Sequence, residues 1–178
     1  IVASGATVTT SSTTTTTIAP SSVDQVYAPT LATPGSFGSG SAVQTGVRVN
    51  VSCTGSLPGV WWYRSASDTG TITVNVWSST GTLLATGTGD PTAGPGWRYV
   101  AFTTAYSVTA GASLVVGVHH PSGVYAYAYG TSSGNAFNAR SISSASGCLT
   151  LPASAGGALN GLYDYSAAAT VPTSSYQD

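Results

Sequence analysis

The feature that most constrains the fold is a series of short runs in which hydrophobic and polar residues alternate. The run 42–52, for example, places Val47, Val49 and Val51 on one side. Alternation with period two puts every second side chain on the same face of a β-strand. Similar runs, separated by turn signals and with no convincing helix between them, occupy residues 60–64, 71–78, 82–88, 97–104, a stretch within 107–120 and 124–130.

Composition supports the same fold class. Hydrophobic residues make up 42% of the 178, which is enough apolar surface to form a core in one domain. Lys and Glu are absent and Gln is scarce, whereas Gly, Ser and Thr are abundant; this balance favours strands and turns over helices. We therefore expect an all-β fold, an antiparallel β-sandwich of jelly-roll or immunoglobulin-like type, over residues 23–178. The segment 42–130 is its best-supported core.

Residues 1–22 differ from the rest, because they contain a Ser/Thr tract with almost no hydrophobic pattern and a proline at position 20. We interpret them as an extended N-terminal arm or linker. Threonine also has a high β-propensity, so the alternative is that the arm pairs with the sheet edge of a neighbouring subunit.

Charge excludes several functions. The net charge is -1 and only 5% of residues are charged, so the chain lacks the basic surface that nucleic-acid binding requires. No apolar run approaches the ~20 residues of a membrane-spanning helix. We expect no nucleic-acid partner, no membrane insertion and no cofactor.

The two cysteines, Cys53 and Cys148, are too far apart for a CxxC redox motif and too few to form a zinc site alone. They form either one long-range disulfide or two buried thiols. A disulfide would suit a protein exposed to oxidising surroundings.

Two adjacent histidines, His119 and His120, come before a Pro-Ser-Gly turn. Adjacent side chains in a strand point to opposite faces, so we predict no metal site here, with one histidine bonded to the turn and the other in solvent. Asp68 and Asp90 lie in turn sequences, where Asp commonly accepts hydrogen bonds from nearby backbone amides. No GxSxG motif or paired carboxylates are apparent, so we expect no catalytic residues.

Aromatic residues carry the strongest binding signal. Tyr125, Tyr127 and Tyr129 recur at period two and therefore share one face of a strand. Either they form an exposed row that stacks on sugar rings, or they lie in the core or under a loop. In the aromatic strand 60–64, Trp62 should face opposite to its two neighbours. We expect Trp77 and Trp97 to serve core packing.

The order of these segments resembles an uncharacterised β-sandwich family, a domain of unknown function that recurs in bacterial surface and secreted multidomain proteins and in minor tail proteins of actinobacterial phages. The residues that carry the resemblance are Gly46-Val47-Arg48, Trp61-Trp62-Tyr63-Arg64, Asp68-Thr69-Gly70-Thr71, Val76-Trp77-Ser78, Gly81 to Ala85, Gly96-Trp97, Val108 to Gly111, and His119 with Pro121, Gly123 and Tyr125.

The resemblance implies a non-enzymatic structural and recognition module on a virion exterior, as a phage minor tail or decoration protein. Low charge with many Thr, Ser and Tyr residues suits a surface that contacts host-surface glycans by stacking and hydrogen bonds. The partners of such a module would be other virion or surface-protein subunits in a homo-oligomeric assembly. The alternative is a carbohydrate-binding or adhesion module of a secreted or cell-surface bacterial protein. In either case the expected location is extracellular.

Overall fold

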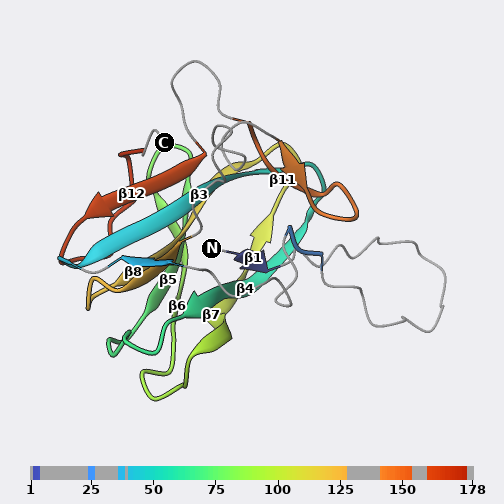
Figure 1. Cartoon of the computed structure of the whole chain (residues 1–178). Coiled ribbons are helices and arrows are strands. Elements are labelled where there is room, and N and C mark those ends of the chain that lie inside the picture. Colours follow the sequence, from blue (N-terminus) through green and yellow to red (C-terminus); the bar gives the residue numbers. More distant parts are fainter. Residues whose placement is uncertain are drawn as a thin grey trace, which may run out of the picture.

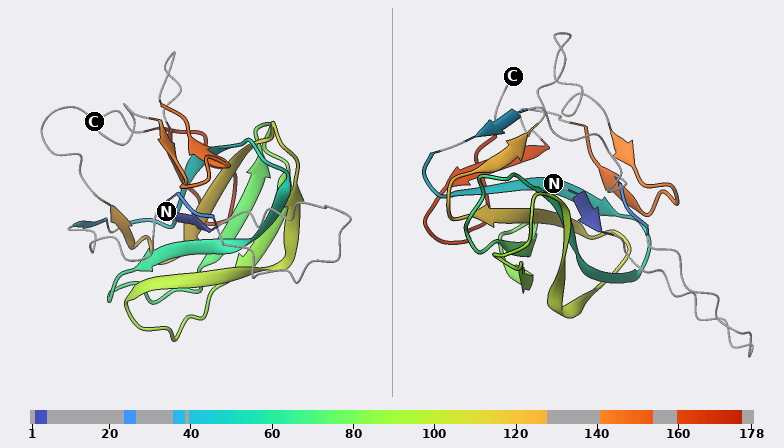
Figure 2. Two further views of the ribbon diagram at one scale, coloured as in Figure 1. Left: turned by 90° about the vertical axis from the view of Figure 1, so that its right-hand side faces the viewer. Right: turned by 60° about the horizontal axis from the view of Figure 1, so that its bottom comes forward.

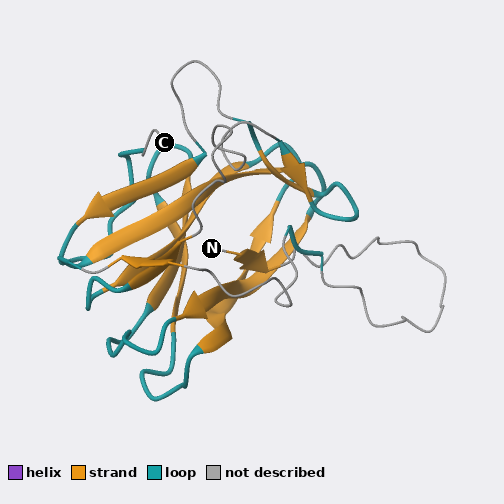
Figure 3. Cartoon of the chain, in the orientation of Figure 1, coloured by secondary structure: helices purple, strands orange, loops and turns teal. Residues whose placement is uncertain are grey.

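All regular structure in the described part of the chain is β-strand (Figures 1 and 3). The expected all-β class is confirmed. Within this part no helix is long and apolar enough to cross a membrane. The computed structural model describes residues 2–4, 24–26, 36–38, 40–127, 141–153 and 160–175.

The larger sheet is antiparallel and is built around β3 (Val43–Val51) and β8 (Ser113–His120). Its strand order is β10-β11-β3-β8-β5-β6, and β12 pairs with the first half of β3. The remaining strands are β5 (Thr73–Ser78), β6 (Leu83–Thr88), β10 (Ile142–Ser143), β11 (Leu149–Leu151) and β12 (Gly161–Tyr165).

The smaller sheet has three antiparallel strands in the order β1 (Val2–Ser4), β4 (Gly55–Arg64) and β7 (Gly96–Val108). The two sheets face each other and form the expected sandwich (Figure 2). A separate two-stranded ribbon joins β2 (Ser36–Gly38) to β9 (Tyr125–Tyr127).

One continuous hydrophobic core lies between the sheets. Trp62 of β4 and Val100 of β7 enter it from the smaller sheet, and Val49, Val74 and Val116 enter it from the larger one. All five are nearly inaccessible to solvent. Burying a side chain of this size stabilises the fold by about 1.5–3 kcal/mol, so the alternation seen in the sequence is what holds the two sheets together.

The other face of the larger sheet is also covered, because the segment after β12 folds back across it. There a second buried cluster forms from Trp77, Val115 and Leu162, with Val171 packed against it. A Cβ atom on Gly46 would lie only 2.8 Å from Cγ of Pro172. Glycine at this position therefore allows the C-terminal segment to lie directly on the sheet.

One predicted boundary is wrong. The sequence predicted a strand only over residues 60–64, with turn signals before it, but β4 begins at Gly55 and includes Leu57-Pro58-Gly59. The ladder to β7 shifts register between Leu57 and Gly59. Such an irregularity accommodates proline, because a bulged residue needs no ladder hydrogen bond.

The predicted arm is described only in part. Residues 2–4 form β1, which pairs with β4 of the same chain, and the rest of the segment 1–22 lies outside the described residues. Just beyond it, the carboxylate of Asp24 accepts hydrogen bonds from the hydroxyls of Ser144 and Ser146. The domain boundary at residue 22 stays a prediction.

Cys53 and Cys148 form a disulfide, so the disulfide alternative is confirmed. Cys53 follows β3 and Cys148 precedes β11, the strand that pairs with the end of β3. The bridge joins positions 95 residues apart. In the chain-entropy account of disulfide stabilisation, a cross-link restricts the unfolded chain more strongly when the loop that it closes is longer.

Candidate ligand-binding surface

Four aromatic side chains gather on the outer face of the smaller sheet, and we refer to them as the aromatic patch. They are Trp61, Tyr63, Trp97 and Tyr99. Across the β4–β7 ladder Trp61 is the register partner of Tyr99, and Tyr63 is the partner of Trp97. The ring centroids are 5.4 Å apart in the first pair and 5.5 Å apart in the second, which is within the range of favourable aromatic contacts.

Strand alternation explains why the patch faces outward. Trp62 lies between Trp61 and Tyr63 in the chain and is only 2% exposed in the core. This confirms that Trp62 faces opposite to its neighbours. Trp97 shares the outer face with Tyr63 and is half-buried, outside both buried clusters. The expectation that Trp97 serves core packing is therefore wrong, whereas Trp77 is buried as expected.

Tyr99 is the most open member of the patch, with 41% of its surface exposed. Its ring lies across Gly59 of the neighbouring strand, where a Cβ atom would come within 2.7 Å of the phenol oxygen. Partial burial raises the pKa of Tyr99, so the phenol remains protonated and can donate a hydrogen bond at neutral pH. A flat ring with an adjacent hydroxyl group can stack on a sugar ring and hydrogen-bond to its hydroxyl groups.

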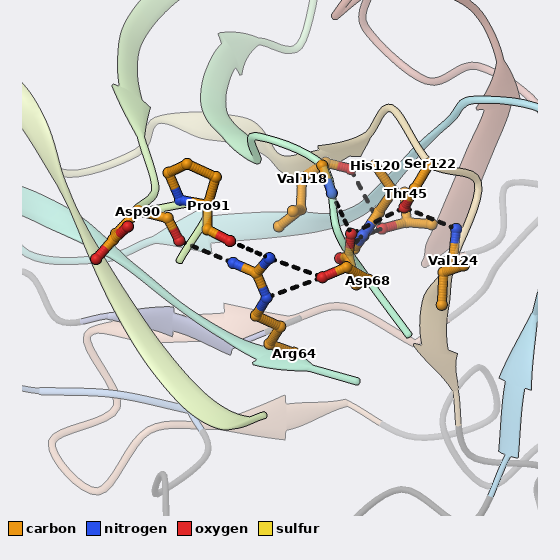
Figure 4. Close-up of polar contacts among 10 residues, drawn as sticks. Thr45, Arg64, Asp68, Asp90, Pro91, Val118, His120, Ser122 and Val124 are labelled. Carbon is orange, nitrogen blue, oxygen red and sulfur yellow. Dashed lines mark hydrogen bonds and ion pairs between the residues drawn. The ribbon is translucent and has the colours of Figure 1, made fainter. Parts of the chain in front are cut away.

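At the end of the patch, Arg64 fastens two loops together (Figure 4). Its guanidinium donates hydrogen bonds to the backbone carbonyls of Asp68, Asp90 and Pro91, at 2.7 to 3.1 Å. The side chain is only 3% exposed. A buried guanidinium requires such acceptors because desolvation is costly, so Arg64 holds the loops 65–72 and 89–95 together at the end of β4.

Between these loops lies a cavity of about 230 Å³, and Ser65, Asp68 and Thr69 line it on one side. Residues of the loop after Asp90 line the other side, namely Pro91, Ala93, Gly94 and Pro95. In the chain, Pro95 comes two residues before Trp97. The cavity therefore lies at the end of the strands that carry the aromatic patch.

Next to Arg64, the carboxylate of Asp68 makes a buried polar network (Figure 4). One oxygen accepts hydrogen bonds from the hydroxyl of Ser122 at 2.8 Å and from the amide of Gly70 at 3.3 Å. The other lies 3.5 Å from Nδ1 of His120, and Nε2 of His120 lies 3.3 Å from the hydroxyl of Thr45. The predicted role of Asp68 in stabilising its own turn is confirmed. The contacts of its carboxylate with Ser122 and His120 were not predicted from the sequence.

Burial governs the acid–base properties of this pair. Burial lowers the pKa of His120 below its ordinary value of 6.5, and the nearby Asp68 only partly offsets this. Burial also acts to raise the pKa of Asp68, but the close contact with His120 and the hydrogen bond from Ser122 outweigh it and hold the pKa below 3.8. At neutral pH the carboxylate is therefore ionised.

The prediction that one histidine meets solvent is wrong, because His119 and His120 are only 6% and 4% exposed. They do point to opposite faces, as expected. His120 faces the core side, where its ring lies 5.8 Å from that of Trp62. His119 lies beneath the C-terminal segment, with Nε2 3.1 Å from the carbonyl of Ser166. Among the described residues no group of three or more His, Cys or Asp side chains is arranged to hold a metal.

Of the predicted tyrosine row, only the ring of Tyr125 is described. It is half-buried, lies over Gly38 of β2 and has its centroid 6.1 Å from that of His120. Tyr127 pairs with Ser36 in β9, but its side chain and the whole of Tyr129 lie outside the described residues. An exposed row of three tyrosines thus stays a prediction.

Fold and site together define a disulfide-linked antiparallel β-sandwich with an aromatic outer face. A family model named "Domain of unknown function (DUF4082)" matches residues 30–178. The chain belongs to this family, which confirms the resemblance seen in the sequence. No curated protein and no solved structure matches the chain.

Proposed function

We propose that this domain is a non-enzymatic structural and recognition module that contacts host-surface glycans on the exterior of a phage virion, as part of a minor tail or decoration protein. The aromatic patch carries the proposal. It places two tryptophans and two tyrosines side by side on one sheet face, where stacking on sugar rings needs no charge. A neutral binding face suits a chain with so few charged residues.

The disulfide supports a location outside the cytoplasm, since disulfides persist mainly in oxidising surroundings. The same features support the second candidate function, a carbohydrate-binding or adhesion module of a secreted or cell-surface bacterial protein. Genomic context separates the two settings. Neighbouring genes for capsid and tail proteins favour the virion, and an export or sorting signal in the full-length precursor favours the bacterial surface.

The buried network supports a structural rather than a catalytic role for its members. Thr45, His120 and Asp68 follow one another as hydroxyl, imidazole and carboxylate, which is also the order of a catalytic triad. However, the imidazole packs between the rings of Trp62 and Tyr125 and is almost inaccessible. In this arrangement the polar contacts connect β3, β8 and the turn that contains Asp68.

Binding to a panel of neutral and acidic glycans and to isolated bacterial cell walls tests the proposal. The parent protein should bind at least one of them, and Tyr99→Ala should bind it about tenfold more weakly, equivalent to about 1.4 kcal/mol. Thr103→Ala is the matched control, because Thr103 is exposed on the same strand beyond the patch. Equal loss of binding in the two variants, or none in Tyr99→Ala, would refute a role for the patch.

A further inference from the structure

The edge of β4 is occupied by a strand that lies outside the family domain. β1 pairs Val2 with Trp61 and Ser4 with Gly59, whereas the family match begins at residue 30. Among the described residues, β1 is the strand that pairs with this edge of β4, and without it the described part of the smaller sheet would consist of β4 and β7, with backbone groups of β4 open to pairing at residues 59–61. Such an edge is a template for pairing with another extended chain.

The connection to β1 is long enough to reach a second molecule. Asp24 is held in place by Ser144 and Ser146, and residues 5–23 join it to β1. At 3.3–3.6 Å per residue this segment can span about 65 Å. A domain of this length has a radius of gyration of about 16 Å, which corresponds to a diameter of roughly 40 Å. The same tether therefore allows β1 to reach either its own β4 or that of a neighbour.

We propose that the β4 edge is a strand-accepting site, and that β1 of a second copy fills it when copies are packed closely. β1 makes the same residue pairs with β4 whether the two strands belong to one chain or to two copies. Exchange of β1 between copies therefore costs little free energy beyond that of bringing the copies together. β1 contributes only three register pairs, which makes it easy to release.

Concentration decides which arrangement forms. Belonging to the same chain gives β1 an effective local concentration in the millimolar range at its own β4, so pairing within one chain prevails in dilute solution. In a dense array of subunits the concentration of neighbouring edges reaches the same range. Exchanged strands would then link adjacent subunits through backbone hydrogen bonds, independently of any glycan contact by the aromatic patch.

A cross-linking experiment tests the exchange. Val2→Cys and Trp61→Cys are prepared as separate full-length proteins, one of them isotopically labelled, because positions 2 and 61 are register partners. The mixture is oxidised over a range of protein concentrations up to the millimolar range, and cross-linked peptides are identified by mass spectrometry. A mixture of Val2→Cys with Thr103→Cys is the control, since Thr103 is exposed on β7, away from β1.

The proposal predicts a heterodimer cross-linked between positions 2 and 61, with a yield that rises with concentration to about tenfold above the control, as expected when intermolecular pairing competes with a tethered strand. A yield no higher than the control at every concentration would overturn the proposal. In that case the double variant in a single chain shows whether β1 pairs only with its own β4 or with neither.

Discussion

Trp61 and Tyr99 face each other across the β4–β7 ladder, with their ring centroids 5.4 Å apart and their planes inclined by 50°. The residues that follow them in the chain, Trp62 and Val100, both enter the hydrophobic core. The same two strands therefore build the interior and the aromatic patch. Because the two faces are separate, the patch can be altered without removing core side chains.

Two adjacent tryptophans test this separation of faces. Trp62→Ala should lower the free energy of unfolding by about 3–5 kcal/mol, the usual cost of truncating a buried aromatic side chain. Trp61→Ala loses mainly its contact with Tyr99 and should cost about 0.5–1.5 kcal/mol. Urea unfolding of both variants gives the comparison. If they lose similar stability, the assignment of faces is wrong.

Removal of the disulfide should weaken the fold. We expect Cys53→Ser with Cys148→Ser to lower the free energy of unfolding by about 2–5 kcal/mol, because the bridge closes a long loop in the unfolded chain. Denaturant unfolding measures this effect, and intact mass before and after reduction confirms the bridge in the parent. An unchanged unfolding midpoint in the double variant would show that the bridge contributes no stability.

The two loop-binding arginines should differ in importance. Arg64→Lys leaves buried carbonyls without their hydrogen-bond donors and should cost about 2–3 kcal/mol. Arg98 also donates to loop carbonyls, those of Gly94 and Pro95, but at exposed positions. Arg98→Lys should therefore cost about 0.5 kcal/mol or less. Thermal unfolding of the two variants checks which substitution costs more stability. A larger loss of stability in Arg98→Lys than in Arg64→Lys would contradict the prediction.

His120 should make stability depend on pH. Because its pKa is lowered in the folded protein, the unfolded chain binds the proton more readily. Its contribution to stability is therefore fully present above pH 6.5 and decreases as the pH falls below that value. Asp68, whose folded pKa is also lowered, adds a further loss only below 3.8.

The check is the free energy of unfolding of the parent and of His120→Gln between about pH 7 and pH 5, the range in which histidine titrates. Glutamine retains polar atoms near Thr45 and Asp68 but does not titrate. The parent should lose more stability than the variant on acidification. If the parent instead becomes more stable as the pH falls, the pairing with Asp68 outweighs burial and the stated sign is wrong.

Alternation in the sequence was enough to predict the sandwich, because Val49, Val74 and Val116 reach the core through period-two patterns that local geometry imposes. The same rule placed Trp62 opposite to Trp61 but did not say which of the two faces the core. It could not foresee that Pro58 lies in a strand, since the bulge that accommodates it depends on the register with β7.

The candidate site was harder to predict because it depends on contacts between distant segments. Trp97 and Tyr99 stand two residues apart, which signals a shared face, but only the β4–β7 register shows that they meet Tyr63 and Trp61. Likewise, burial of His119 depends on the returning C-terminal segment, more than 40 residues further along the chain. No local pattern contains that information.

The most direct test of the proposed function compares two aromatic positions against the same ligand. Calorimetric titration of the strongest-binding glycan should give an affinity at least about tenfold lower for Trp61→Ala. Tyr125→Ala, in which a half-buried ring beside His120 is removed, should bind as the parent does. Loss of binding in Tyr125→Ala with parental affinity in Trp61→Ala would contradict the aromatic patch and would instead favour the tyrosine row that includes residue 125.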